Sequence, residues 1–321
     1  MFNREAGALI TIIPAVFRLL DEASHGEFQP WVARCLYYHS GSPAPALVLD
    51  DLKEQGFRMA DSRAGLDMQH CLLVMKALAQ LHAASAVLHL KDPEIFRPYS
   101  ESYYYCERLR KSLQPSFELT MQIVAKEVEK WPLYNTRFAS KLHKIAENVV
   151  DFLIKDVERN DDDFNVLIHG DFKLNNMMFR YSDDTQEVLD VRFVDYQLCH
   201  FTSPAQDLQY FLHTSPSINL LENHSSLVEE YHKTLQGTLT LLGHEYLCPS
   251  LQKLHKQLDK MGRFAVIMSC SVLPLVLADK NNMPDLERVL KKEESVHFSD
   301  KYKEVLKTLL PSFEQKGWLD L

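Results

Sequence analysis

The sequence predicts an α+β fold, with a small mixed segment at the front and a mostly helical body behind it. Turn-rich segments at Gly26–Pro30 and Ser40–Pro45 bound short apolar runs, which indicates strands. Most of the chain beyond residue 67 shows the apolar spacing of helices, and only Phe164–Leu198 shows a strong strand pattern. A length of 321 residues suits two domains or one large bilobed domain.

The front segment is expected to hold one helix and two strands. The strands would be Trp31–Tyr38 and Ala46–Leu49, joined by a Gly/Pro loop. A two-stranded hairpin is marginal by itself, so it needs a packing partner. We expect a helix over Glu5–Leu20 to be that partner, because its apolar side would otherwise be exposed.

The body is expected to be helical apart from one β-hairpin. Helical patterns run over Met68–Leu88, Tyr103–Lys155 with breaks at Pro115 and Pro132, Leu208–Leu212, Leu227–Leu242, Leu251–Ala278 and Tyr302–Leu310. A short strand at Val166–Ile168 precedes the hairpin. Its strands would be Met177–Tyr181 and Val188–Val194, joined by a turn that begins at Ser182.

Composition and charge limit the class of partner. The chain carries 35 Lys and Arg against 44 Asp and Glu, a net charge of −9. This balance argues against nucleic acid and against an anionic membrane surface, because both attract clustered Lys and Arg. Hydrophobic residues make up 46% and charged residues 25%, which is typical of globular proteins and excludes disorder of the whole chain.

Cysteine use and the apolar segments bear on location. Six cysteines are dispersed, with no Cys-x-x-Cys pair, so we expect free thiols in a reducing, cytoplasmic setting. The apolar stretch Ala6–Phe17 resembles a signal peptide, but Glu5, Pro14 and the missing cleavage site favour a buried helix. The run Phe264–Ala278 is too short to span a bilayer, so we expect no membrane partner.

Candidate chemistry gathers around the hairpin. Asp171 follows the first strand in the motif His-Gly-Asp, Asn176 comes five residues later, and Asp195 leaves the returning strand. Phosphoryl transfer from ATP needs a carboxylate that orients the attacking hydroxyl, and oxygen ligands for the magnesium that bridges the phosphates. We assign Asp171 to the first role, and Asn176 and Asp195 to the second. Taken singly, each is more often a turn or cap residue, so the prediction depends on the ordered set.

These motifs resemble the ecdysteroid kinase-like family, also called CHK kinase-like. The matching segments are HGDFKLNNMMF (169–179), VRFVDYQ (191–197), LVLDDL (47–52), GFRMADSRAGLD (56–67), LAQLHAASAVL (78–88) and SPAQDLQYFLHTS (203–215). The family is related to the aminoglycoside and choline kinases and shares the protein-kinase-like bilobed fold. The resemblance implies that residues 1–52 are a remnant of the N-terminal lobe with the hinge. Residues 53–321 would be the mostly helical C-terminal lobe with the catalytic loop and hairpin.

The resemblance also implies a role for each site residue. Asp171 would be the catalytic carboxylate, and Asn176 and Asp195 would be the magnesium ligands. The hinge that meets the adenine of ATP would include Leu49, Asp50 and Leu52. Glu5 would pair with a phosphate-binding lysine, and Asp207 would brace the catalytic loop. The cofactors would be ATP and magnesium. The acceptor would be a small alcohol, for which a steroid-like alcohol is one candidate.

The start of the chain departs from the family pattern. Family members begin with strands, a phosphate-covering loop and a lysine, whereas Phe2–Glu5 already resembles the helix that supplies that lysine's glutamate partner. The sequence also contains no Gly-x-Gly-x-x-Gly. We therefore expect an N-terminally truncated form with an incomplete N-terminal lobe. The alternative to an active kinase is a catalytically inactive pseudokinase, or a truncated isoform, that acts by binding. The oligomeric state is left open.

Overall fold

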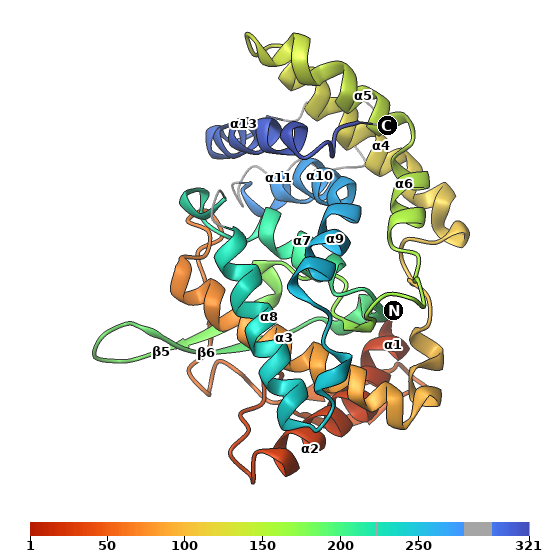
Figure 1. Cartoon of the computed structure of the whole chain (residues 1–321), viewed down its shortest axis with the longest axis vertical. Coiled ribbons are helices and arrows are strands. Elements are labelled where there is room, and N and C mark those ends of the chain that lie inside the picture. The colour runs from red at the N-terminus through yellow and green to blue at the C-terminus, as the bar shows by residue number, and fades with distance from the viewer. Residues whose placement is uncertain (222–223, 279–296, 321) are drawn as a thin grey trace.

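The computed structural model describes residues 1–221, 224–278 and 297–320, and shows a helical body with small antiparallel sheets (Figure 1). Helices dominate the described chain, and each sheet within it has two or three strands. The α+β class predicted from the sequence is therefore confirmed. The domain boundary after residue 52 stays a prediction.

The front of the chain is one long helical segment. Helix α1 (Phe2–Gly7), a π-helical turn (Ala8–Ile12) and helix α2 (Ile13–Ala23) follow one another without a break. Their apolar side is buried, and α2 packs on helix α3 (Met68–Lys91). The buried helix predicted over Glu5–Leu20 is therefore confirmed, with slightly wider bounds.

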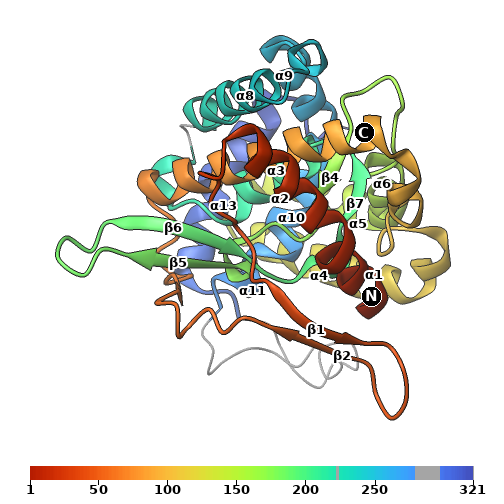
Figure 2. The ribbon, with the colours of Figure 1, turned by 90° about the horizontal axis from the view of Figure 1, so that it is seen from below.

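A hairpin follows this segment. Strand β1 (Cys35–His39) pairs antiparallel with strand β2 (Ala46–Leu49), and the two extend away from the helical body (Figure 2). The ring of Phe2 stacks on Tyr38 with 6.2 Å between centroids, so the hairpin does lean on the helix. Trp31 was expected in the first strand, but it lies ahead of that strand and its ring is buried.

Helix α3 is the central helix of the core. It begins after Asp67, whose carboxylate accepts a hydrogen bond from the backbone N–H of His70. Of the helices within the described residues, it alone is long and apolar enough to cross a membrane. Its most apolar 18-residue window is 78% buried inside the fold, as in the core helix of a globular protein. Packing within the chain therefore accounts for its apolar surface.

The remaining α-helices within the described residues form the body. They are α4 (Arg110–Val128), α5 (Ser140–Glu147), α6 (Val149–Asp156), α7 (Ala205–Thr214), α8 (His224–Leu241), α9 (Leu251–Lys260), α10 (Gly262–Ser271), α11 (Leu273–Val276) and α13 (Asp300–Gln315). The single helix expected over 251–278 is divided into α9, α10 and α11. The last break lies just before Pro274, whose ring cannot continue a helix from the preceding turn.

Helix α4 corrects two further expectations. It begins at Arg110, because the segment that starts at Tyr103 is a set of bends and a short 3₁₀ turn. It also continues through Pro115, where a break was predicted. The lost backbone hydrogen bond is tolerated because Leu113, Phe117 and Met121, which lie on one face of the same helix, are buried in the core. The predicted break at Pro132 is present.

Two small sheets frame the predicted site. Strands β4 (Val166–Ile168), β5 (Met177–Tyr181) and β6 (Val188–Phe193) match the predicted strands closely, and the β5–β6 hairpin extends from the body in Figure 1. The sequence did not predict β3 (Arg58–Met59), which pairs with β5, or β7 (His200–Thr202), which pairs with β4. Strands of two or three residues are too short to show a periodic pattern, and of β3, β4 and β7 only β4 consists of an unbroken run of apolar residues.

Candidate active site

The loop after β4 places a carboxylate at the end of a buried strand. All residues of β4 are buried, and His169, Gly170 and Asp171 follow directly. Gly170 has a φ of +83°, and a Cβ atom at this position would lie 2.3 Å from the carbonyl oxygen of Leu198. Only glycine satisfies both conditions. The turn that positions Asp171 therefore depends on Gly170.

Asp207, in the first turn of α7, holds the backbone of this loop. Its buried carboxylate accepts hydrogen bonds from the N–H of His169 at 2.7 Å and of Gly170 at 2.9 Å. The Nε2 atom of His82, on α3, lies 3.4 Å from the same carboxylate. Burial lowers the pKa of His82 despite the neighbouring Asp207, so a neutral ring faces the carboxylate. The brace expected from Asp207 is present.

Replacing Asp207 with alanine is expected to destabilise the protein. Two buried N–H groups would lose their acceptor, at about 1–3 kcal/mol each. The free energy of unfolding, measured by urea denaturation, should fall by roughly 2–6 kcal/mol. Asp207→Asn is the matched control and should lose less, because its remaining oxygen still accepts one of the two bonds. Unchanged stability of Asp207→Ala would contradict the brace.

The Asp171 carboxylate is surrounded by hydrogen-bond donors. The hydroxyl of Tyr210 donates to Oδ1 at 2.6 Å, and Nδ2 of Asn176 donates to Oδ2 at 2.9 Å. The ammonium of Lys173 contacts both oxygens. Burial alone would raise the pKa of Asp171, but the charge and hydrogen bond of Lys173, followed by Tyr210, outweigh it and hold that pKa below its usual value. Asp171 is therefore an ionised carboxylate with a fixed orientation.

Asn176 and Asp195 lie next to one another where β5 begins and β6 ends. The N–H of Val194 donates to the carbonyl of Asn176 at 3.0 Å. The side-chain Nδ2 of Asn176 donates to the carbonyl as well as the carboxylate of Asp171, so its Oδ1 is the atom left for another ligand. Asp195 has a left-handed φ of 71°, and its Oδ2 accepts a hydrogen bond from Gln197 at 3.1 Å. The structure thus brings the three predicted side chains to one end of the hairpin.

Glu5, from the front of the chain, reaches the same place. Its carboxylate accepts a hydrogen bond from the backbone N–H of Tyr196 and lies near Asp195. Burial, and then the charge of Asp195, raise the pKa of Glu5. Glu5 forms no ion pair with any residue that the structure describes. Two neighbouring carboxylates with no cation between them make this point attractive to a positively charged ligand.

The predicted hinge lies beside these groups. Leu49 ends β2, and Leu52 is buried in a small apolar cluster against which Leu49 also packs. Met178 and Val194 pack on the same cluster, so the hinge contacts the strands that carry the oxygen donors. The backbone N–H of Asp50 is already bonded to a main-chain carbonyl at 3.0 Å. An adenine contact by Leu49, Asp50 and Leu52 stays a prediction.

Sequence reasoning missed three residues that hold the loop 169–176 or its Asp171 carboxylate in place. They are Lys173 and Tyr210, which contact the Asp171 carboxylate, and Ser215, whose hydroxyl accepts a hydrogen bond from the N–H of Leu174 at 3.0 Å. Tyr210 and Ser215 both lie in the segment SPAQDLQYFLHTS, which was noted only as a motif. Nothing in its spacing indicates that these hydroxyls face a loop about 40 residues earlier.

The donor set fits magnesium. Mg²⁺ prefers oxygen ligands and is usually held by one or two protein side chains together with substrate phosphates and water. The amide oxygen of Asn176 and the carboxylate of Asp195 are such a pair. Across the described part of the chain, no group of three or more His, Cys, Asp and Glu side chains could hold a metal ion.

A cavity of about 520 Å³ lies at the opposite end of β4 from this loop. Phe164 and Asn165, which precede the strand, line it together with Phe201 of β7. Asp171 is not part of its lining. The cavity is therefore separate from the loop that carries Asp171, and we do not assign the acceptor alcohol to it.

The model of the ecdysteroid kinase-like family matches residues 1–244, well over half of the chain. The chain therefore belongs to the ecdysteroid kinase-like family, and the resemblance drawn from its motifs is confirmed. No match was found among curated proteins.

Two solved structures match over most of this chain. One is an ethanolamine kinase from Plasmodium vivax, with 12% identity and a TM-score of 0.43, over 96% of this chain and 74% of that chain. The other is a choline kinase from Cryptosporidium parvum Iowa II, with 13% identity and a TM-score of 0.44, over 95% of this chain and 77% of that chain. Likenesses this distant do not identify an acceptor.

Proposed function

We propose that the protein is an ATP- and magnesium-dependent kinase that phosphorylates the hydroxyl of a small alcohol, with a steroid-like alcohol as one candidate. The observation that carries the proposal is the ionised Asp171 carboxylate, fixed in a braced loop beside the oxygen donors of Asn176 and Asp195. Phosphoryl transfer uses such a carboxylate to orient the hydroxyl and such donors to bind the metal. Membership of the ecdysteroid kinase-like family supports the same class of reaction.

The lowered pKa of Asp171 suits orientation better than strong basicity. The transition state of phosphoryl transfer is largely dissociative, so the acceptor hydroxyl needs to be aligned before it needs to lose its proton. In the proposal, Asp171 accepts a hydrogen bond from that hydroxyl and takes the proton late. Lys173 places a positive charge beside the same point. Bound magnesium would neutralise charge on the β- and γ-phosphates.

The nucleotide would lie between the hinge and these donors. We propose that the backbone of Leu49–Leu52 meets the adenine, since this segment packs against Met178 and Val194, next to the oxygen donors. Glu5 would lie on the side of the nucleotide site where a positively charged group binds. Its carboxylate accepts a hydrogen bond from the backbone of Tyr196 and lies near the Asp195 carboxylate.

A second candidate is a pseudokinase, or a truncated isoform, that binds nucleotide or a partner with little turnover. The Glu5 carboxylate favours it, because the family resemblance assigns that glutamate to a phosphate-binding lysine, and no lysine within the described residues pairs with it. A positive group that clamps the phosphates can contribute a factor of about 10³ or more in rate. Nucleotide binding through Asn176 and Asp195 could then persist while transfer is slow.

Transfer of labelled γ-phosphate from ATP to small alcohols tests the proposal. The panel should include steroid alcohols, choline and ethanolamine, each with and without magnesium. We expect magnesium-dependent labelling of at least one acceptor by the wild type and none by Asp171→Asn. Magnesium-dependent ATP binding without labelling of any acceptor would favour the second candidate. Absence of such binding by the folded protein would contradict the first candidate and the nucleotide-binding form of the second.

We also propose a cytoplasmic location. Support comes from the six cysteines, all of which are free thiols. Their free state suits a reducing compartment. Fractionation of expressing cells tests this, and recovery of the protein in a secreted fraction would contradict it.

A further inference from the structure

Helix α7 touches the loop 169–176 at three points. Asp207 binds backbone N–H groups at the start of the loop, and Tyr210 binds the side chain of Asp171. The hydroxyl of Ser215, just beyond the end of the helix, accepts a hydrogen bond from the N–H of Leu174. Residues three apart lie on one face of a helix, so Asp207 and Tyr210 face the loop together. One helix therefore holds both the main chain of the loop and its carboxylate.

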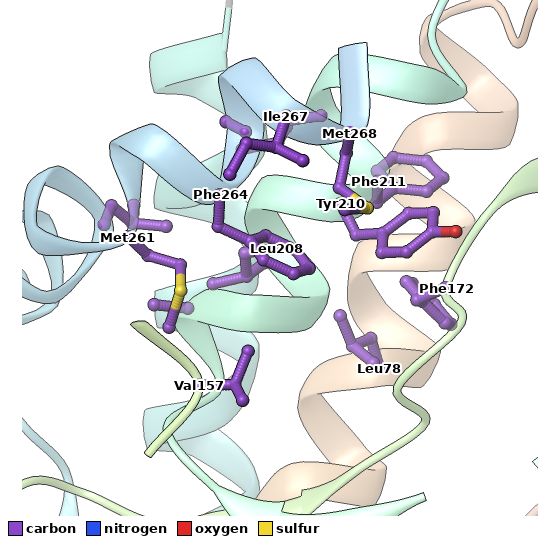
Figure 3. Close-up of a cluster of buried hydrophobic side chains, with 14 of the residues drawn as sticks. Leu78, Val157, Phe172, Leu208, Tyr210, Phe211, Met261, Phe264, Ile267 and Met268 are labelled. Carbon is purple, nitrogen blue, oxygen red and sulfur yellow. The ribbon is translucent and has the colours of Figure 1, made fainter. Parts of the chain in front are cut away.

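The phenol of Tyr210 is held rigidly. Tyr210 is 3% exposed, and its ring lies 6.0 Å from that of Phe264, centroid to centroid. Figure 3 shows the ring packed beneath Met268, with its oxygen directed out of the apolar cluster toward the segment that carries Phe172. That oxygen is the donor to Oδ1 of Asp171. A buried tyrosine has few torsions free, so its hydroxyl is a fixed reference point.

The other donors to Asp171 are less permanent. The Lys173 side chain is 21% exposed and sits on a flexible stem, so the phosphates of a nucleotide would compete with Asp171 for its ammonium. Asn176 donates to Oδ2, and the same side chain is the proposed metal ligand. Once a nucleotide binds, Lys173 acquires a new partner, whereas Asn176 can keep its Nδ2 bond to Asp171 only in the amide orientation that the metal on its Oδ1 permits. Tyr210 is assigned no contact with the phosphates or the metal, so its bond to Oδ1 can remain when they bind.

We propose that Tyr210 is a positioning residue, which holds Oδ1 of Asp171 in place while Lys173 and Asn176 engage the nucleotide. The inference rests on the proposed kinase function. It predicts that Oδ2, rather than Oδ1, is the oxygen that meets the acceptor hydroxyl. It also explains why α7, whose side chains are all buried, directs the Tyr210 hydroxyl at the Asp171 carboxylate in addition to the bonds that Asp207 makes with the loop backbone.

The test is Tyr210→Phe, with Tyr302→Phe as matched control. Tyr302 is also a buried tyrosine with one hydrogen bond, from its hydroxyl to the carbonyl of Ser269 at 3.3 Å, but it lies on α13. Both variants lose one buried hydroxyl. We expect kcat of Tyr210→Phe to fall about 10- to 100-fold, because small misplacements of a reacting group cost rates of that size. Its KM for ATP should stay within about twofold of wild type, and Tyr302→Phe should keep both constants.

A crystal structure of Tyr210→Phe gives a second readout that needs no turnover. The Asp171 carboxylate should be rotated or present in several orientations, whereas Tyr302→Phe should keep the single orientation. An unchanged carboxylate, or a kcat equal to that of Tyr302→Phe, would overturn the positioning role. If the wild type transfers no phosphate, the proposed function fails. The orientation of Asp171 would still decide the role of Tyr210.

Discussion

Asp171→Asn is expected to abolish phosphoryl transfer while magnesium-dependent ATP binding persists. The substituted amide keeps the shape of the side chain but loses the charge that aligns the hydroxyl and accepts its proton. We expect kcat to fall by about 10³-fold, the middle of the range for removing a positioned acid–base group. ATP binding should survive because Asn176 also donates to the main-chain carbonyl of Asp171, a bond that the substitution leaves in place. Single-turnover transfer and calorimetric titration of ATP measure the two quantities separately.

Asp190→Asn is a suitable control for the loss of one negative charge. Asp190 lies on β6 of the same hairpin, and its carboxylate pairs with Arg192 at 2.7 Å and with Arg180 at 3.3 Å. It makes no contact with Asp171. Its transfer rate should therefore equal that of the wild type. A rate for Asp171→Asn within tenfold of this control would argue against the catalytic role.

The part of the site that could be predicted is the part that is local in sequence. Asp171 and Asn176 share one loop, and the strands β5 and β6 are marked by alternation and a turn. Once those strands pair, Asp195 must return to the end where Asn176 begins, since Val194 bonds to Asn176. Residue spacing was therefore sufficient to bring the three side chains together.

The rest depended on packing between distant segments. The hydroxyl of Tyr210 reaches Asp171 only because α7 lies against the loop, and a sequence gives no orientation for that contact. Likewise, β7 forms because His200 and its neighbours meet β4, not because three residues show a period. Pro115 was misread for the same reason, since burial of its helix outweighs the local cost.

Asp195→Asn is expected to remove the magnesium dependence of ATP binding. Magnesium binds through oxygen and strongly favours a carboxylate over an amide, because the charge of the carboxylate offsets that of the ion. Changes around a metal ligand alone cost 10- to 100-fold in affinity, so loss of the ligand charge should weaken magnesium–ATP binding by about 100-fold or more. Calorimetric titration of ATP with and without magnesium measures this directly, and Asp190→Asn again controls for charge.

Replacing Asp195 with asparagine should change metal binding without destabilising the fold. Asp195 has a left-handed φ of 71°, a conformation that asparagine tolerates better than alanine, so the backbone should not be strained. Removing the charge at residue 195 also relieves the repulsion that, after burial, raises the pKa of Glu5, so the folded protein should be no less stable. A loss of binding in Asp195→Asn then reports on the metal rather than on unfolding. If Asp171→Asn lost binding to the same degree, separate catalytic and metal roles would be wrong. Both residues would then belong to a single charge cluster that holds the nucleotide.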